Sequence, residues 1–218
     1  MKQQRPALNV YVAAIPETLT LTPLFPPERQ KEIEEVRNET LRRERYCVWK
    51  LLERALDHTF GLKMEDLSFQ KQPEGKWICD RVHFSQSHSV SAVAVAVSNA
   101  PVGVDLEGAE EFFARFADPA RLLRLEKKVC TAGELAELRD VSEFLALWTK
   151  KEAIFKCFGM EGVFLPDRID TRTYASSTRM VALPERYSLS VCAVTPERPR
   201  FYIADADGIR PMGETAQA

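Results

Sequence analysis

Apolar and polar positions along the chain follow two periods, which together predict a mixture of strands and helices. Short runs of small and β-branched residues predict strands at residues 8–15, 89–98 and 101–107, with shorter strands near residues 67–69 and 76–79 and a strand-rich region after residue 186. Segments with apolar positions at helical spacing predict helices at residues 28–61, 110–127 and 133–158. Elements of both kinds in this order predict an α+β fold.

A second regularity links the two parts of the chain. Residues that lie 99 positions apart (148 − 49) match in a helix and in a following strand: Trp49 with Trp148, Glu53 with Glu152, Ser89 with Ser188, Ser91 with Ser190, Ala94 with Ala193, and Val95 with Val194. The repeat predicts two similar α/β halves related by a pseudo-twofold axis, at residues 1–99 and 100–204, with a ligand cleft between them. Residues 205–218 have little apolar content and are expected to form a loose tail.

Charge and cysteine content exclude several classes of protein. The 218 residues carry a formal net charge of -2, which provides no overall basic field for nucleic acid or an anionic membrane. The N-terminus lacks the apolar run of a signal peptide, and no segment approaches a membrane span. The five cysteines are scattered without a C-x-x-C pair, which argues against a disulfide framework or a cysteine-rich zinc site. We therefore expect a reduced, cytoplasmic protein.

Two carboxylates stand out in the predicted strand "VGVDLEG". Asp105 and Glu107 are two positions apart and therefore share one face of the strand, whereas Val104 and Leu106 point to the other face. A hard cation such as Mg²⁺ relieves the repulsion between neighbouring carboxylates. Two solvated acids on an edge strand are the alternative interpretation.

The predicted helix "FLALWTKKEAIFKCFG" places Trp148, Glu152 and Lys156 on one stripe, since they are spaced by four residues. Asp140 is the expected N-cap and Gly159 the expected C-terminal stop. Glu152 and Lys156 on this stripe are either an ordinary ion pair on the surface, or a third carboxylate and a cation that could bind phosphate.

Other candidate residues are isolated cations and hydroxyl groups. Ser87 and His88, at a strand entry in "HFSQSHS", offer donors that suit a phosphate, although a lone histidine is more often structural. Lys76 is presented by the turn "PEGK", and Arg45 lies in a cluster of arginines on the first long helix. The phosphate-binding loops G-x-x-x-x-G-K-[ST] and G-x-G-x-x-G do not occur.

The segments "FSQSHS", "VGVDLE" and "WTKKEAIFK", in this order, resemble the motifs of the 4′-phosphopantetheinyl transferase family. The family's asparagine in the first motif is replaced by Ser85 or Gln86, depending on register, and its P-x-G-K-P turn ends here in Trp77. The resemblance extends from about Arg45 to about Phe158. Length and internal repeat resemble the pseudodimeric, surfactin-synthetase-activating class, which modifies carrier proteins of fatty-acid, polyketide or nonribosomal-peptide synthesis.

The resemblance implies a role for each candidate residue. It implies Mg²⁺ ligands at Asp105, Glu107 and Glu152, and coenzyme A contacts at Arg45, Lys76, Ser87, His88, Lys151 and Lys156. The adenosine end and the phosphates would lie against the first half, and the metal carboxylates and catalytic helix would come from the second. Glu152, Lys156 and His88 are the expected catalytic residues.

The implied reaction is the transfer of 4′-phosphopantetheine from coenzyme A to a serine of an apo acyl or peptidyl carrier protein. Glu152 or a water on the metal would accept the serine proton. The chain would work as a monomer and bind neither nucleic acid nor membrane. A non-catalytic protein that binds coenzyme A, a Mg²⁺-dependent phosphohydrolase and a structural interaction module are the alternatives.

Overall fold

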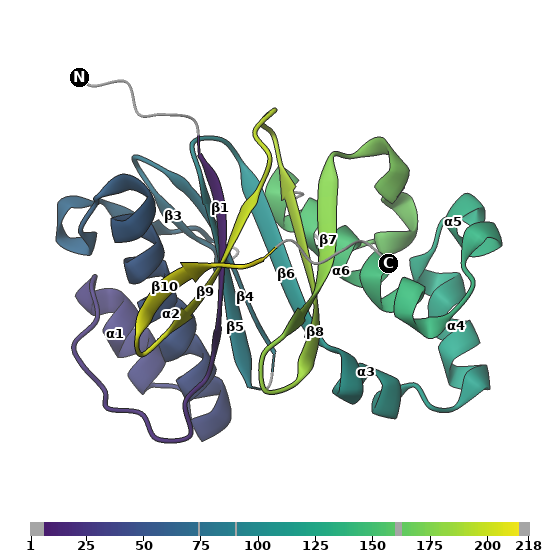
Figure 1. Ribbon diagram of the computed structural model, residues 1–218, viewed down its shortest axis with the longest axis horizontal. Coiled ribbons are helices and arrows are strands. Elements are labelled where there is room, and N and C mark those ends of the chain that lie inside the picture. Colours follow the sequence, from purple (N-terminus) through teal and green to yellow (C-terminus); the bar gives the residue numbers. More distant parts are fainter. Residues whose placement is uncertain (1–6, 74, 90, 160–162, 214–218) are drawn as a thin grey trace.

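The computed structural model describes residues 7–73, 75–89, 91–159 and 163–213. Two groups of helices flank a central layer of strands, with α1 and α2 on one side and α3 to α6 on the other (Figure 1). The helices are α1 (Pro27–Glu34), α2 (Glu39–Phe60), α3 (Ala109–Arg115), α4 (Pro119–Val129), α5 (Ala132–Glu137) and α6 (Val141–Phe158), with short 3-10 turns η1 (Met64–Asp66), η2 (Pro166–Arg168) and η3 (Thr171–Thr173). The mixed α+β architecture agrees with the prediction from the sequence.

The strands form two larger sheets and one small hairpin. The first sheet has the order β10-β9-β1-β5-β4, the second has the order β6-β8-β7, and β2 pairs with β3. All pairs are antiparallel except β1 with β9. The strands are β1 (Leu8–Ala14), β2 (Phe69–Lys71), β3 (Trp77–Cys79), β4 (His83–Ser89), β5 (Ala92–Ser98), β6 (Val102–Gly108), β7 (Ser176–Ala182), β8 (Arg186–Ala193), β9 (Arg200–Asp205) and β10 (Gly208–Pro211).

The two sheets share one local topology. In the first, β1 is followed by α2, β4 and β5, and β5 inserts between β1 and β4. In the second, β6 is followed by α6, β7 and β8, and β8 inserts between β6 and β7. Helix α2 packs on the first sheet and α6 on the second.

The 99-residue offset aligns helices more faithfully than strands. Trp49 lies in α2 and Trp148 in α6, which are the corresponding helices of the two sheets. Ser89, however, ends β4, whereas Ser188 lies inside β8, the strand that corresponds to β5. A single offset fails here because the connections between helix and strands differ in length in the two parts of the chain.

The predicted long helices are broken where capping residues interrupt them. The segment 28–61 divides into α1 and α2, and Asn38 caps α2 by accepting a hydrogen bond from the backbone of Leu41. Asp118 caps α4 ahead of Pro119, and Asp140 caps α6, as expected, by accepting from Ser142 and Glu143. Gly159 ends α6 with a φ of 56°, a left-handed conformation that glycine adopts without steric cost.

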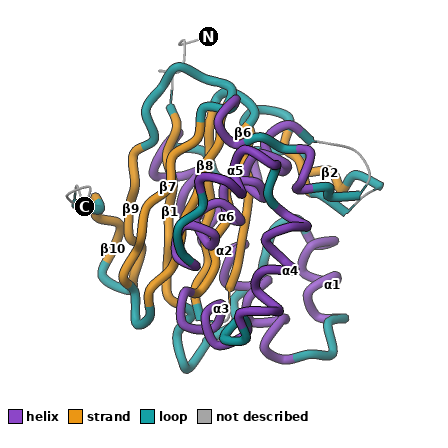
Figure 2. The backbone as a smooth tube through the Cα atoms, turned by 90° about the vertical axis from the view of Figure 1, so that its right-hand side faces the viewer, coloured by secondary structure: helices purple, strands orange, loops and turns teal. Residues whose placement is uncertain are grey.

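The C-terminal segment differs from the expected tail. Gly208–Pro211 form β10, which pairs with β9, and β9 in turn pairs with β1. Residues 200–211 therefore extend the first sheet, with the β9–β10 hairpin at the margin of the strand layer (Figure 2). The expectation of a loose segment from residue 205 is thus wrong for β10, and residues 214–218 lie outside the described residues. Among the described residues, no helix has the length and apolar character needed to span a bilayer.

Glu32 of α1 binds the β2–β3 hairpin to the helices. It accepts hydrogen bonds from Arg29, from Lys71 of β2 and from the indole of Trp77 in β3. Burial alone would raise the pKa of Glu32, but the bonds from Lys71, Arg29 and Trp77 outweigh burial and lower the pKa to about 2. The carboxylate therefore stabilises the folded chain most strongly when it is ionised.

We expect Glu32→Gln to reduce the free energy of unfolding at pH 7 by roughly 1–3 kcal/mol. Because the folded pKa lies below the unfolded value of 4.5, this stabilisation is complete above pH 4.5 and disappears as the pH falls towards 2. Urea unfolding of both proteins from pH 7 to pH 3 measures the difference, which should shrink as the solution is acidified. A difference that stays constant across this range would contradict the assignment.

Candidate functional site

Strand β6 carries the two carboxylates of "VGVDLEG" on the face covered by α6. Gly103 lies on the same face, two residues before Asp105. A Cβ atom at Gly103 would lie 1.9 Å from the carbonyl oxygen of Ala153 and 2.4 Å from the amide nitrogen of Cys157, both in α6. The glycine therefore permits the helix to pack directly on the strand backbone, and this close packing brings α6 over Asp105 and Glu107.

Lys156 connects α6 to Asp105 and to β4. Its ammonium lies 2.7 Å from Oδ1 of Asp105, 3.2 Å from the carbonyl oxygen of Val104 and 3.4 Å from the hydroxyl of Ser87. Ser87 also donates a hydrogen bond of 2.9 Å to Oδ1 of Asp105. The structure thus brings together Ser87, Asp105 and Lys156, which come from three different elements.

The second oxygen of Asp105 has no such partner. Oδ2 is buried and makes no hydrogen bond to any described residue. The side chain of Asp105 is 6% exposed, so water does not fully solvate this oxygen either. A buried, unpaired carboxylate oxygen is costly unless a further ligand binds it.

The neighbouring carboxylates repel one another. Burial, followed by the charge of Asp105, raises the pKa of Glu107 to about 7, with Glu111 and Glu152 adding to the effect and Lys156 opposing it. Burial and the charge of Asp105 also raise the pKa of Glu152. The predicted trio of Asp105, Glu107 and Glu152 therefore occupies one electrostatic neighbourhood.

These carboxylates have the chemistry that a hard divalent cation requires, namely oxygen donors, mutual repulsion and one orphaned oxygen. They are not arranged as a finished metal site, because no three His, Cys, Asp or Glu side chains of the described residues already surround a common point. Lys156 is paired with Oδ1 of Asp105 instead, and it balances part of the negative charge.

His88 faces α2 and not the carboxylates. Its Nδ1 lies 3.0 Å from Oε2 of Glu44, a buried residue of α2. Burial, followed by the charges of Lys156 and Arg45, lowers the pKa of His88, whereas Asp105 opposes them. We assign a proton to Nδ1, which donates to Glu44. Arg45, predicted from the sequence, lies close enough to influence His88 by its charge.

Lys76 approaches the C-terminal end of α6. Its ammonium donates to the carbonyl oxygen of Lys156 at 3.2 Å. The side chain lines a hollow next to this contact, together with Ile78, Cys79, Val82, His83, Phe84, Pro101, Val102 and Cys157. Lys76 and Lys156 are thus neighbours, although 80 residues separate them in the sequence.

Lys151 does not belong to this cluster, so its assignment as a phosphate contact is wrong. Its side chain is 0% exposed, and its ammonium binds Oε2 of Glu134 at 2.7 Å and the carbonyl oxygens of Pro166 and Ile169. Glu134 in turn accepts hydrogen bonds from the backbone amide and the hydroxyl of Thr171. Lys151 therefore anchors α5 and the η2–η3 segment to α6.

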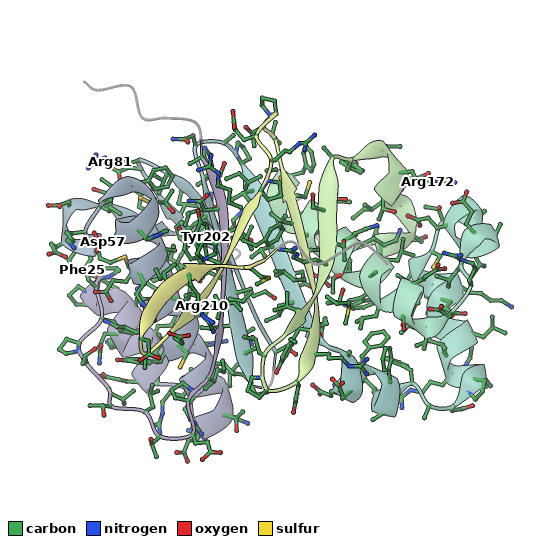
Figure 3. All side chains as sticks on the ribbon, in the orientation of Figure 1. Phe25, Asp57, Arg81, Arg172, Tyr202 and Arg210 are labelled. Carbon is green, nitrogen blue, oxygen red and sulfur yellow. The ribbon has the colours of Figure 1, made fainter. Side chains whose placement is uncertain are left out.

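Arg172 lies next to this buried pair and forms ion pairs with Asp170 and Glu137. It lies at the outer margin of the helices, on the side away from Tyr202 (Figure 3).

Several residues near the site could not be assigned from the sequence. Glu44 follows the arginines of α2 and carries no motif, and its pairing with His88 depends on the tertiary fold. Arg29 is buried, its Nε has no partner among the described residues, and its charge also influences His88. The alternating serines of "SQSHS" were a readable signal, since Ser85, Ser87 and Ser89 share one face of β4.

Comparison with known proteins finds similarity to one family. Residues 101–194 match the 4′-phosphopantetheinyl transferase superfamily. The chain is 32% identical over 117 residues to the 4′-phosphopantetheinyl transferase gsp of Aneurinibacillus migulanus, covering 53% of this chain and 48% of that protein. It is 30% identical over 112 residues to 4′-phosphopantetheinyl transferase psf-1 of Bacillus pumilus, covering 50% of this chain and 47% of the relative.

A longer match is more distant. The 4′-phosphopantetheinyl transferase Sfp of Bacillus subtilis (strain 168) is 26% identical over 173 residues, covering 68% of this chain and 73% of that protein. The match to gsp and psf-1 spans about half the length of each relative. The family match contains all of β6, α6 and β8, and hence Asp105, Glu107, Glu152 and Lys156.

Proposed function

We propose that this chain belongs to the 4′-phosphopantetheinyl transferase superfamily, which its residues 101–194 match, and that it transfers 4′-phosphopantetheine from coenzyme A to a serine of an apo carrier protein. The products are the holo carrier protein and adenosine 3′,5′-bisphosphate, and the reaction depends on Mg²⁺. One observation carries the proposal: Asp105, Glu107, Glu152 and Lys156 influence one another by charge where α6 packs on β6, and Oδ2 of Asp105 lacks a partner among the described residues.

We assign Asp105, Glu107 and Glu152 as the residues that would hold Mg²⁺. When bound there, the ion would neutralise charge on the pyrophosphate of coenzyme A. Burial, followed by the charge of Asp105, raises the pKa values of Glu107 and Glu152, and a cation beside them would favour the ionised form of both.

The cations around the carboxylates would hold coenzyme A. Lys156 contacts both β4 and β6 and is placed to bind a phosphate oxygen. Ser87 and His88 offer further contacts from β4. Lys76 and Arg45 would hold the adenosine 3′-phosphate end. Such contacts position the substrate, which is the main contribution that a protein makes to phosphoryl transfer.

The nucleophile in this mechanism belongs to the carrier protein. Its serine hydroxyl attacks the β-phosphate of coenzyme A, a new P–O bond forms, and adenosine 3′,5′-bisphosphate leaves. We assign Glu152 as the acceptor of the serine proton, since a carboxylate beside the reacting group can act as a general base.

The proposal also covers how the two halves of the chain are arranged, its oligomeric state and its cellular compartment. We propose that the two β–α–β–β units are halves related by a pseudo-twofold axis, at residues 1–99 and 100–204, with the substrate between them and the chain acting as a monomer. The β9–β10 hairpin begins within the second of these ranges, but its strand β9 pairs with β1 of the first half. We also propose a cytoplasmic setting, in keeping with five cysteines that are all free thiols.

Intact-mass measurement tests the proposed function directly. The chain is incubated with coenzyme A, Mg²⁺ and a panel of apo carrier proteins, each paired with a variant that lacks the acceptor serine. We expect at least one carrier to gain the mass of one phosphopantetheinyl group, and its serine variant to gain none. Release of phosphopantetheine without any carrier would indicate a phosphohydrolase, and binding of coenzyme A without either product would indicate a non-catalytic protein.

We expect Lys76→Ala to raise the KM for coenzyme A by roughly tenfold and to change kcat little, because the 3′-phosphate is remote from the bond that breaks. Dephospho-coenzyme A, which lacks this phosphate, is the matched substrate. Steady-state kinetics with both substrates should show a much smaller effect with dephospho-coenzyme A. An equal loss with the two substrates would rule out a contact between Lys76 and the 3′-phosphate.

A further inference from the structure

The two sheets meet along a seam between β4 and β6 that backbone pairing does not close. Within the described residues, β4 pairs with β5 and β6 pairs with β8, and no ladder joins β4 to β6. Successive backbone amides of a strand point alternately to its two sides. The amides of Val104, Leu106 and Gly108 therefore share one side of β6, the side that faces β4.

Three serines of β4 satisfy these amides. Ser85 accepts from the amide of Val104 at 3.0 Å, Ser87 from that of Leu106 at 3.2 Å, and Ser89 from that of Gly108 at 3.0 Å. The contacts advance together along both chains, so β4 and β6 run in the same direction. All three serines are buried, so water cannot take the place of a lost hydroxyl at little cost.

The serine side chains lie between the two strand backbones, because each hydroxyl binds an amide of β6. Directly paired strands lie about 4.8 Å apart, and a side chain inserted between the backbones holds them further apart. Lys156 reaches the same side of β6, where it contacts the carbonyl oxygen of Val104 and the hydroxyl of Ser87. The same edge of β6 thus serves both the serines and the lysine of the candidate site.

Along β6, the residues whose amides bind the serines alternate with the carboxylate residues of the candidate site. Asp105 lies between the amides held by Ser85 and Ser87, and Glu107 lies between those held by Ser87 and Ser89. We propose that Ser85 and Ser89 are positioning residues, whose hydroxyls fix β6 so that Asp105 and Glu107 face α6 while the seam stays open for Lys156. Ser87 is different, because its hydroxyl also binds Asp105 and belongs to the site itself. The catalytic consequence rests on the proposed function, but the geometry of the seam does not.

The variants Ser85→Ala and Ser89→Ala each remove one acceptor from the seam. Amide hydrogen exchange, resolved by NMR, should become about tenfold faster at Val104 in the first variant and at Gly108 in the second, because each amide loses its buried partner. In transfer assays, the Mg²⁺ concentration for half-maximal rate should rise several-fold while the KM for coenzyme A changes less than twofold. This split distinguishes positioning of the carboxylates from a general loss of structure.

Tyr46→Phe is the matched control. The hydroxyl of Tyr46 accepts from the backbone amide of Thr22 at 2.7 Å, so the variant also removes a side-chain acceptor from a backbone N–H, but in α2 and away from β6. We expect faster exchange at Thr22 and an unchanged dependence on Mg²⁺.

Three outcomes would overturn the inference. The seam itself is wrong if the amides of Val104 and Gly108 in the wild-type protein exchange as fast as exposed amides, a measurement that needs no variant to fold. The pairing of each serine with its amide is wrong if exchange at Val104 is unchanged in Ser85→Ala and exchange at Gly108 is unchanged in Ser89→Ala. The positioning role is wrong if both serine variants change the Mg²⁺ dependence no more than Tyr46→Phe does. If the wild-type protein modifies no carrier, the proposed function fails, and the exchange measurements still decide the seam.

Discussion

Asp105→Ala and Glu152→Ala should each reduce the rate of transfer by roughly a hundredfold to a thousandfold and leave the chain folded. Each variant removes one of three proposed ligands for Mg²⁺ and leaves charge on the pyrophosphate less well neutralised. Asp105→Ala also leaves Lys156 without its carboxylate partner, so the loss should be larger in this variant. Transfer to the carrier protein, measured by intact mass over a series of Mg²⁺ concentrations, gives the rate constants.

The control for this prediction is a carboxylate that acts on the site only through its charge. Glu111 of α3 raises the pKa of Glu107, but it is an exposed residue that pairs with Arg115. Glu111→Gln should change the rate less than threefold, since it removes a nearby negative charge without removing a ligand. Near-normal turnover of Asp105→Ala and Glu152→Ala at saturating Mg²⁺, with thermal unfolding unchanged, would refute the metal assignment.

The sequence predicted those site residues whose spacing alone determines which face they share. Asp105 and Glu107 needed only the strand period, and Glu152 and Lys156 only the helix period. The structure adds the cause of their meeting, because Gly103 brings α6 onto β6. A sequence pattern reports the faces of one element, whereas the pairing of faces depends on packing between elements.

The same reason explains what the sequence could not predict. Glu44 and His88 lie on α2 and β4, and neither residue has a local feature that points to the other. The serines of β4 indicated a strand, but their role at the seam depends on the absence of backbone pairing with β6 in the described residues. Long-range pairing of this kind is set by topology and not by local periodicity.

Lys151 shows how a local pattern can mislead. It immediately precedes Glu152 in the motif, and cations beside a candidate phosphate site are natural contacts. Adjacent residues of a helix point in directions about 100° apart, however, so Lys151 faces away from the site. Its actual partner, Glu134, lies 17 residues earlier in the chain, on α5.

Lys151→Met should therefore act on stability and not on coenzyme A. The ammonium is completely buried against Glu134, and its removal leaves the carboxylate without a compensating charge. Burial would raise the pKa of Glu134, but the hydrogen bond from Lys151, with those from Thr171 and Thr131, outweighs burial and lowers it. Breaking a buried pair from one side costs roughly 3–5 kcal/mol. For a chain of this size, the melting temperature should fall by about 10 °C.

Lys150→Met is the matched control, because it removes the same charge one position earlier on the same helix, where the side chain is not fully buried. We expect this variant to melt within about 2 °C of the wild-type protein. The double variant Lys151→Met with Glu134→Gln should recover part of the stability lost in Lys151→Met, since it removes the uncompensated charge. The KM for coenzyme A, measured below the melting temperature, should be the same for both single variants. A raised KM in Lys151→Met with an unchanged melting temperature would instead return Lys151 to the phosphate site.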